Sequence, residues 1–283
     1  MSVLTSFQSI SRPALKYESY IDTYEIILSK YKGQKVTFVE VGVLGGGSLQ
    51  AWKNFFHPES RIIGIDLNHS LKAELESEGF EIFIGNQSDY DFWDNFYSKV
   101  GNIDILLDDG GHTNLQQGVT LIKTIPMVND NGVIIIEDVH TSYMEKFLNP
   151  SKYSFINFTK YFIDVINDRF YSLNKIKSMD VVKYNVQYIS LFESIIAFHI
   201  DKSKCYISVE KRFGKESDEY LLPIDIREDG HKINFFNKMS KMIIPLFSQN
   251  VKKSEIGKFF KYLFYFDFSQ LKENNKMKSL FKK

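Results

Sequence analysis

Acidic and histidine side chains gather at the ends of two apolar segments of this sequence. The segment IDILLDDGGH (residues 103–112) ends in two aspartates, two glycines and a histidine, and GVIIIEDVHTSY (residues 132–143) carries two acids and a histidine after its apolar run. Strand propensity does not explain these endings, because aspartate is depleted in strands. Clustered carboxylates repel one another unless a cation lies among them, and oxygen ligands suit Mg²⁺ or a similar hard ion. The pattern therefore predicts a metal site.

Two neighbouring strands must bring these groups together. Residues 113–128 carry apolar side chains at helical spacing, which predicts a crossover helix between two parallel strands. Side chains alternate along a strand, so Glu137 and Asp138 cannot face one ion unless the strand breaks into a loop there, and the same holds for Asp108 and Asp109. The two glycines after Asp109 permit such a break. The alternative is that one acid of each pair caps a helix or holds a cofactor.

A second pattern indicates a cofactor with a nucleoside. The segment VTFVEVGVLGGGS (residues 36–48) is an apolar run that ends in an acid and a glycine-rich turn, and the later run IIGID ends in Asp66. This order predicts a strand, a tight loop, a helix and a second strand, and open parallel sheets bind ligands at the carboxyl edge of such strands. We expect Asp66 to hold the ribose hydroxyls. The alternative is an ordinary turn that contains several glycines.

The glycine spacing argues against a dinucleotide cofactor. The G-x-G-x-x-G pattern fails in both possible registers, because Leu44 and Gln50 occupy required glycine positions. The E-x-G-x-x-x-G spacing instead resembles the first motif of class I S-adenosylmethionine-dependent methyltransferases, in which the backbone passes close to a cofactor without phosphate. This resemblance implies that four residues bind the cofactor: Glu40, Gly42, Gly46 and Ser48.

Two further segments are candidates for cofactor contacts. The turn GNQSD (residues 85–89) follows a predicted strand over residues 81–84, and methyltransferases of this fold usually contact adenine at this position. The resemblance implies Gln87 and Ser88, whereas the alternative is a polar turn that caps the next helix through Ser88 or Asp89. Asp108 is also a candidate for cofactor binding, because the other acid of its pair, Asp109, is the candidate for the metal.

Four motifs together resemble one family more narrowly. The motifs DDGGH, IEDVHTSY, GVLGGGSLQAW and YIDTYEIIL look like those of metal-dependent sugar O-methyltransferases of the mycinamicin and rhamnosyl type, and cephalosporin-hydroxylase-like proteins share this domain. The likeness covers residues 17–200. It implies that Asp109, Glu137 and Asp138 bind Mg²⁺ and that His112 is the general base, with Asp109 part of the catalytic group. Alternatively, His112 is a structural histidine that is hydrogen-bonded to a carboxylate.

The resemblance is not complete around the expected base. Relatives often have serine between the first glycine and the histidine, where this chain has Gly111, so a hydroxyl is lost there. His140 and Tyr143 are candidates for the substrate pocket. The alternative for His140 is that it caps the segment that follows.

The resemblance implies a fold and a reaction. The expected fold is α/β and Rossmann-like, a mostly parallel seven-stranded sheet with helices on both faces. The expected enzyme is a Mg²⁺-dependent O-methyltransferase that methylates a sugar hydroxyl, nucleotide-linked or in a glycoside, in polysaccharide or natural-product biosynthesis. Coordination to Mg²⁺ would lower the pKa of that hydroxyl, and a nearby imidazole could take the proton. The alternatives are methylation of a phosphorylated or other non-sugar molecule, and a non-catalytic binding protein.

The chain of 283 residues divides into three expected parts. Residues 1–35 form an N-terminal arm and helix, residues 36–200 form the methyltransferase core, and residues 201–283 form a C-terminal extension. Within them, residues 1–13 are expected to be a loose arm. A helix over residues 14–32 either packs on the core or covers the cofactor. Further predicted elements are a helix over residues 155–168 and closing strands over residues 181–188 and 195–200.

Composition restricts the partners. The formal net charge is zero, so nothing global indicates nucleic acid. One cysteine, Cys205, excludes an intramolecular disulfide and fits the reducing cytoplasm. No apolar run resembles a secretion signal or reaches the roughly 18 residues of a membrane span.

The C-terminal extension is basic. Residues 201–283 hold 18 Lys and Arg against 11 Asp and Glu, and phenylalanines are interleaved with the lysines. We expect this segment to pack on the core or to pair subunits in a homo-oligomer. The alternative is contact with an anionic membrane surface.

Overall fold

The computed structural model describes residues 1–147, 149, 152–170 and 179–206 of the chain. All of them belong to one compact unit, Met1–Lys211. Apart from residues 201–206, the expectations for the C-terminal extension lie outside the described residues. The expected N-terminal arm and the expected core are parts of the same unit.

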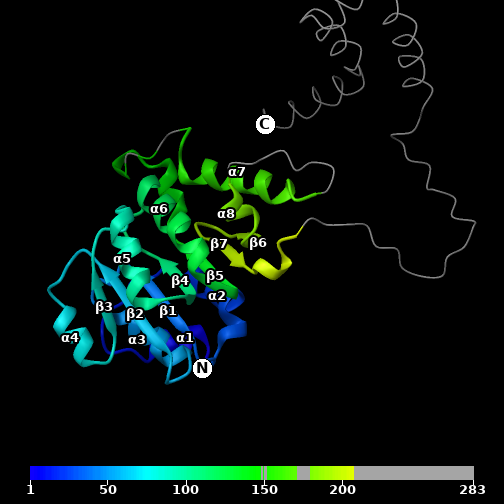
Figure 1. The fold of residues 1–283 in the computed structure, drawn as a ribbon. Helices are drawn as coiled ribbons and strands as arrows, with labels where there is room; N and C mark the ends of the chain where they lie inside the picture. The colour runs from blue at the N-terminus through cyan, green and yellow to red at the C-terminus, as the bar shows by residue number, and fades with distance from the viewer. Residues whose placement is uncertain (148, 150–151, 171–178, 207–283) are drawn as a thin grey trace, which may run out of the picture. The chain divides into compact units, whose positions relative to one another are not determined.

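A twisted sheet forms the centre of this unit (Figure 1). In the described part of the chain it has seven strands in the order β3-β2-β1-β4-β5-β7-β6. The strands are β1 (Thr37–Val41), β2 (Arg61–Asp66), β3 (Glu81–Ile84), β4 (Ile103–Asp108), β5 (Val128–Ile136), β6 (Val186–Leu191) and β7 (Ile196–Ile200). Strands β1 to β5 are parallel, and β7 runs antiparallel to both β5 and β6. The predicted mostly parallel seven-stranded sheet is confirmed.

Helices cover both faces of the sheet (Figure 1). On one face lie α1 (Val3–Gln8), α2 (Glu18–Leu28), α3 (Gly47–Phe55) and α4 (Lys72–Ser77), and on the other lie α5 (Tyr90–Val100), α6 (Asn114–Thr124), α7 (Phe155–Asn167) and α8 (Asp180–Lys183). Short 3₁₀ helices are η1 (Ser29–Tyr31), η2 (Ile125–Met127), η3 (Val139–Tyr143), η4 (Glu145–Phe147) and η5 (Lys202–Lys204). Alternation along the strands explains the two cores: Phe38 packs on the first face and Val39 on the second.

The strand order creates a crevice at the carboxyl edge of the sheet. Strand β1 pairs with β2 on one side and with β4 on the other, so the chain reverses its direction of winding there. The register places Val41 beside Asp108 and Asp108 beside Ile136. Consequently β1, β4 and β5 end at the same level, and the loops that follow them lie side by side.

Three local expectations differ from the structure. Residues 1–13 are not a loose arm throughout, because Val3–Gln8 form α1 with Val3 and Ser6 buried. The expected helix over residues 14–32 begins at Glu18 and leaves residues 9–17 non-helical. The expected strand over residues 181–188 begins at Val186, because Asp180–Lys183 form α8 with Val182 in the core. Periodicity alone does not separate a short buried helix from a strand.

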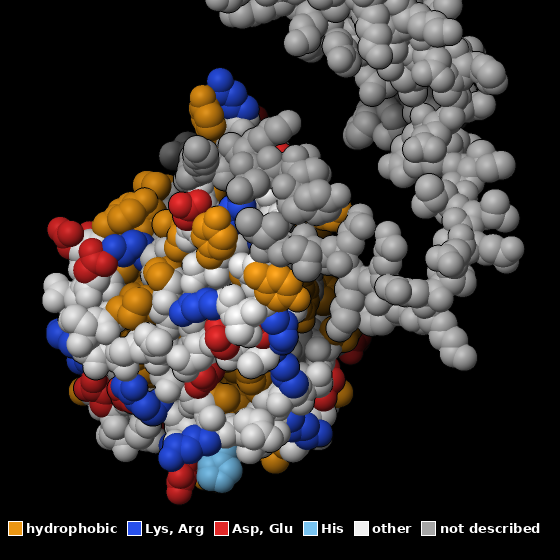
Figure 2. All heavy atoms as spheres, turned by 45° about the vertical axis from the view of Figure 1, so that its right-hand side comes forward, with side chains coloured by type: hydrophobic (Ala, Val, Ile, Leu, Met, Phe, Trp, Pro, Cys, Tyr) orange, Lys and Arg blue, Asp and Glu red, His pale blue; other side chains and the backbone are white. Residues whose placement is uncertain are grey.

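The surface of the unit is mixed in character. On the face drawn in Figure 2, acidic and basic side chains are interspersed with apolar ones. Within the described ranges, no helix combines the length and the hydropathy that crossing a membrane requires.

Candidate active site

A cavity of about 540 Å³ opens at the carboxyl edge of the sheet. The turn after β1, the end of β2 and the loops after β4 and β5 form its walls, and residues 15–17 and Tyr20 line it from the N-terminal side. Cavities of this size hold a drug-sized ligand or a cofactor. Half of the residues assigned to the site from the sequence line this cavity, namely Gly42, Asp66, Gln87, Asp109, His112, Glu137 and Asp138.

The glycine turn after β1 is held in one conformation. Gly42 has φ +88°, and a Cβ placed on it would lie 2.0 Å from the carbonyl oxygen of Asp109. The Asp66 carboxylate accepts hydrogen bonds from the backbone N–H groups of Val43 and Leu44 at 2.9 and 3.1 Å through Oδ2. An ionised carboxylate offers about four lone-pair sites. Oδ1 also accepts a hydrogen bond from the backbone N–H of Asn68 at 2.8 Å, so Asp66 organises the turn and keeps about one lone-pair site for a ligand in the cavity.

Glu40 lies beneath this turn and does not line the cavity. Its Oε2 accepts a hydrogen bond from the Ser48 hydroxyl at 2.8 Å, while Oε1 is buried without a hydrogen-bond partner among the described residues. Burial raises the pKa of Glu40 to about 7. Gly46 has φ +82° and a Cβ there would strike the side chain of Leu75 at 2.4 Å. The direct cofactor contacts of Glu40, Gly46 and Ser48 stay predictions.

Gln87 and Asp108 support the loop after β4. The Gln87 side-chain amide donates to both oxygens of Asp108 at 2.9 and 3.0 Å and accepts from the backbone N–H of Gly111 at 2.8 Å. Asp108 is buried, and this burial raises its pKa to about 6. Gln87 also lines the cavity, whereas Asp108 and Ser88 do not. Asp89 caps α5, as the alternative interpretation of this turn expected.

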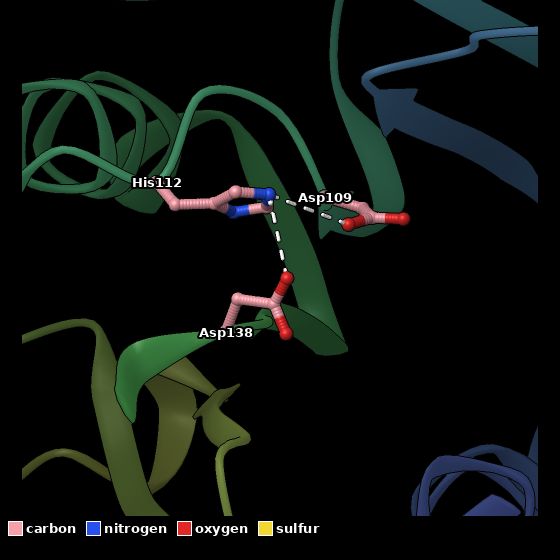
Figure 3. A group of neighbouring side chains, drawn as sticks. All are labelled: Asp109, His112 and Asp138. Atoms are coloured by element: carbon pink, nitrogen blue, oxygen red, sulfur yellow. Dashed lines mark ion pairs between the residues drawn. The ribbon is translucent and has the colours of Figure 1, made fainter. Parts of the chain in front are cut away.

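Asp109, His112 and Asp138 converge at the cavity wall (Figure 3). The Nε2 atom of His112 lies 3.4 Å from Asp138 Oδ2 and 3.9 Å from Asp109 Oδ1. His112 and Asp138 have φ values of +59° and +55°, so both strands break into loop at their acids. This is the break that the alternation of side chains required. The other ring nitrogen of His112, Nδ1, is buried without a partner among the described residues.

Glu137 points away from this group. Its carboxylate accepts hydrogen bonds from the Tyr24 hydroxyl and from the Lys16 ammonium group, the latter at 3.0 and 3.1 Å. Burial raises the pKa of Glu137, and the charge of Lys16 opposes this shift. Glu137 reaches Asp109 through Lys16, whose Nζ lies 2.5 Å from Asp109 Oδ2. The two acids of the 137–138 pair thus have different partners in this structure, whereas the family resemblance implied one shared ion.

The N-terminal segment supplies site residues that were not assigned from the sequence. Lys16 has a side chain that is 5% exposed. Burial lowers its pKa, but Glu137, Asp109 and Glu40 together raise it above the ordinary value, so the amine is charged. The Tyr20 hydroxyl donates to Asp138 and lies 2.8 Å from Ser194 Oγ.

The helix predicted over residues 14–32 gave one indication of the role of this segment. Leu15 and Tyr17 also line the cavity, and the alternative in which this segment covers the cofactor stays a prediction. Lys16 itself lies 93 residues from Asp109 in the sequence, and no local pattern links the two.

The expected substrate residues lie outside the described cavity. The His140 ring bonds to the hydroxyl of Ser194 and packs edge-on against Tyr17 with ring centroids 6.3 Å apart. Tyr143 is 70% exposed. Substrate contacts for His140 and Tyr143 stay predictions.

The residues at this wall fit a divalent cation. Asp109, His112 and Asp138 each offer one ligand atom, and these atoms lie within 4.8 Å of one another. Both carboxylates are partly exposed, at 24% and 19% of the side chain, so an ion can reach them from the cavity. Carboxylate oxygens are the ligands that Mg²⁺ prefers. Glu137 is paired with Lys16 in this structure, and its expected role as a metal ligand stays a prediction.

Comparison with solved structures assigns the fold. The MycE methyltransferase of the mycinamycin biosynthetic pathway, solved with Mg and SAH, superposes with a TM-score of 0.61 and 24% sequence identity over 70% of this chain and 52% of that chain. Its complex with Mg, SAH and mycinamycin VI gives a TM-score of 0.58 at 23% identity, with 70% and 53% coverage. The described unit therefore has the Rossmann-like fold of class I methyltransferases.

Curated proteins are similar in sequence to part of the chain. A mycinamicin VI 2''-O-methyltransferase of Micromonospora griseorubida is 33% identical over 131 residues, which are 44% of this chain and 32% of that protein. A demethylmacrocin O-methyltransferase of Streptomyces fradiae is 30% identical over 131 residues, again 44% of this chain and 32% of that protein. A tetracenomycin rhamnosyl 2'-O-methyltransferase of Streptomyces olivaceus is 29% identical, with 46% and 35% coverage.

These matches cover only part of each relative. Each of the three covers about a third of the curated relative. No family model matches the chain. Within the matched segment, the resemblance to sugar O-methyltransferases that the motifs predicted is confirmed.

Proposed function

We propose that this protein is an S-adenosylmethionine-dependent O-methyltransferase that requires a divalent cation and methylates a hydroxyl group of a sugar, either nucleotide-linked or within a glycoside. One observation carries the proposal. A single cavity contains both the glycine turn organised by Asp66 and the group formed by Asp109, His112 and Asp138. Methyl transfer needs a cofactor site and a group that activates the acceptor within reach of each other.

The cofactor is assigned to the β1–β2 side of the cavity. The Asp66 carboxylate would accept hydrogen bonds from the ribose hydroxyls, and Gln87 lies where the next loop reaches the cavity. The glycine turn lets the backbone approach the cofactor closely, because a side chain at Gly42 has no room. Nothing in this arrangement requires a phosphate group, which is consistent with a sulfonium cofactor.

The acceptor is assigned to the β4–β5 side. Nε2 is the ring nitrogen of His112 that faces Asp109 and Asp138, so it is the atom that would accept the hydroxyl proton. Asp109 and Asp138, together with Glu137 when Lys16 does not occupy it, would hold Mg²⁺ or a similar ion, which supplies Lewis-acid activation of the hydroxyl. Tyr20 orients Asp138 by donating a hydrogen bond to its carboxylate.

The charge of the cavity favours a neutral acceptor over a phosphorylated one. Lys16 is the only lysine or arginine among the described residues that line the cavity, and three carboxylates lie within 4.0 Å of its ammonium group. A phosphate at this position would face Asp109, Glu137 and Asp138, and the proposed divalent ion would be the cation left to pair with it. The carboxylates already share the charge of that ion, so this wall suits a neutral hydroxyl better than a phosphate.

The pathway and location are finer parts of the same proposal. The relatives named above are O-methyltransferases of mycinamicin VI, demethylmacrocin and a rhamnosyl tetracenomycin, which supports natural-product biosynthesis, and polysaccharide biosynthesis is the second setting proposed. Cytoplasmic location is proposed on the single cysteine, whose thiol is buried and free. A homo-oligomer and a membrane-surface contact of residues 201–283 stay predictions.

Calorimetric titration tests the function. We expect S-adenosylhomocysteine to bind and NAD not to bind, with or without a chelator, because the ion is assigned to the acceptor. Methyl transfer from S-adenosylmethionine to a panel of sugars, glycosides and nucleotide sugars should then stop when a chelator is added. Binding of NAD alone would contradict the methyltransferase assignment, and transfer that survives chelation would contradict the metal requirement.

A further inference from the structure

Lys16 places a positive charge among the acids of the proposed active site. Its Nζ lies 2.5 Å from Asp109 Oδ2, 3.0 Å from Glu137 Oε2 and 3.9 Å from Glu40 Oε1. The side chains of Glu40 and Glu137 are 0% and 1% exposed. A cation held by three carboxylates in a buried position is not a solvated surface lysine, so its place among these acids needs an explanation.

A divalent cation would require the same oxygens. Mg²⁺ binds carboxylate oxygens at 2.0–2.1 Å. An ion held by Asp109 and Glu137 would therefore lie within roughly one bond length of the space that the Lys16 ammonium group occupies. Two cations cannot share that space, because their repulsion in a buried site is poorly screened.

Glu40 adds a further buried carboxylate to the acids around Lys16. Glu40 Oε1 is buried without a hydrogen-bond partner in the described part of the chain, and it faces Lys16 across 3.9 Å. A buried carboxylate oxygen without a donor is costly. The cluster therefore has more acceptor capacity than the single ammonium group satisfies.

Lys16 also anchors a segment that crosses the cofactor side of the site. We call residues 9–17 the N-terminal strap. Its backbone passes over the glycine turn, so that a Cβ on Gly47 would lie 2.4 Å from the carbonyl oxygen of Pro13. Arg12 pins the middle of the strap to Glu78 at 2.6 Å.

The rest of the strap has little burial of its own. Most of its residues are exposed, whereas the Lys16 side chain is buried. Lys16 is thus the buried contact at the C-terminal end of the strap, where the exposed Tyr17 ring also packs against Tyr20 and His140.

We propose that the Lys16 ammonium group and a divalent cation compete for Asp109 and Glu137, so that metal binding displaces Lys16 and frees the end of the N-terminal strap that walls the cavity. Lys16 is then a positioning residue that occupies the carboxylates until the metal arrives. The proposal rests on the proposed divalent-ion site and needs neither cofactor nor acceptor. Its tests therefore use metal binding alone.

Titration of the full chain with Mn²⁺ tests the competition. Binding is measured as the loss of the free-ion signal in electron paramagnetic resonance. Lys16→Met keeps the length of the side chain and removes its charge. We expect this variant to bind Mn²⁺ at least about tenfold more tightly than the unmodified protein. The matched control is Lys35→Met, which removes the same charge from an exposed pair with Glu59 and should leave Mn²⁺ affinity unchanged.

A second measurement uses the unmodified chain and does not depend on the folding of a variant. Acetylation of lysine amines, read residue by residue by mass spectrometry, should modify Lys16 slowly without metal and at least about tenfold faster with saturating Mg²⁺. Lys35, with its side chain 66% exposed, provides the internal reference.

The outcomes separate the inference from the proposed function. Equal or weaker Mn²⁺ binding by Lys16→Met, or acetylation of Lys16 that Mg²⁺ does not change, would overturn the competition and leave the metal site intact. If neither the unmodified protein nor Lys16→Met binds Mn²⁺, the divalent-ion site is wrong and the inference falls with it. The cofactor assignment is tested separately by S-adenosylhomocysteine.

Discussion

Gly42 lies so close to the carbonyl oxygen of Asp109 that no side chain fits at position 42. A Cβ on Gly42 would lie 2.0 Å from that oxygen, and the φ of Gly42 is +88°. The backbone N–H of Asp109 in turn donates to Val41 at 2.9 Å. The turn on the cofactor side and the loop that carries Asp109 are therefore one packed unit.

Gly42→Ala should damage both functions of this unit. We expect S-adenosylhomocysteine affinity to fall at least about tenfold, and the free energy of unfolding to fall by about 1–3 kcal/mol beyond the cost of the backbone conformation alone. Calorimetry and denaturant unfolding measure the two effects. Tryptophan fluorescence reports on the described unit, because both tryptophans, Trp52 and Trp93, are buried in it.

Gly33→Ala is the matched control for this substitution. Gly33 also has a positive φ of +67°, but nothing lies within 4 Å of an added Cβ. It should lose only about 1–2 kcal/mol, the cost of a left-handed backbone, with cofactor affinity unchanged. Equal losses in the two variants would show that the contact with Asp109 is unimportant.

His112→Asn tests the general base. Asparagine tolerates the left-handed conformation at this position, where φ is +59°, so the loop should keep its shape. We expect kcat to fall by about 10²–10⁴-fold, with S-adenosylhomocysteine affinity unchanged, because the histidine acts on the acceptor. The matched control is His57→Asn at an exposed histidine, which should leave kcat unchanged. Full activity of His112→Asn would exclude His112 as the base.

Asp66→Asn tests the proposed ribose contact. Charge-assisted hydrogen bonds contribute on the order of 1.5–3 kcal/mol, so S-adenosylhomocysteine affinity should fall by about 10- to 150-fold. Asp89→Asn makes the same chemical change at the N-cap of α5, where asparagine caps equally well, and should bind normally. Unchanged affinity of Asp66→Asn in calorimetry would mean that Asp66 serves the turn alone.

His199 makes the unit sensitive to acid. Burial, with a smaller contribution from Lys30, lowers the pKa of His199 to about 4. The unfolded chain binds the proton more readily than the folded one, so stability is full above the unfolded pKa of about 6.5 and is lost as the pH falls toward 4. At pH 5 this group alone should cost about 2 kcal/mol relative to pH 7.5.

His199→Phe isolates this contribution. Phenylalanine keeps a ring that can stack on Tyr188, whose centroid lies 4.1 Å from that of His199, and it does not titrate. The variant should lose less stability than the unmodified protein between pH 7.5 and 5 in fluorescence-monitored unfolding. An identical pH dependence in both proteins would contradict the assignment.

The local pattern of the sequence was enough to predict the sheet and the acids at its carboxyl edge. Short apolar runs bounded by glycines and acids mark parallel strands. The alternation of side chains along each strand and the order of the strands determine where each acid lies. The same alternation predicted that the strand must break into a loop at Glu137 and Asp138, and β5 does end at Ile136. These features depend on residues close together in the chain.

Only the tertiary structure decided what surrounds those acids. Lys16 reaches Asp109 across 93 residues and Tyr24 reaches Glu137 across 113. Similarly, Gln87 proved to brace Asp108, and α8 replaced the first part of an expected strand because Val182 is buried in the core. Sequence spacing specifies local backbone conformation, but the partner of a buried charge depends on which distant side chain packing brings to it.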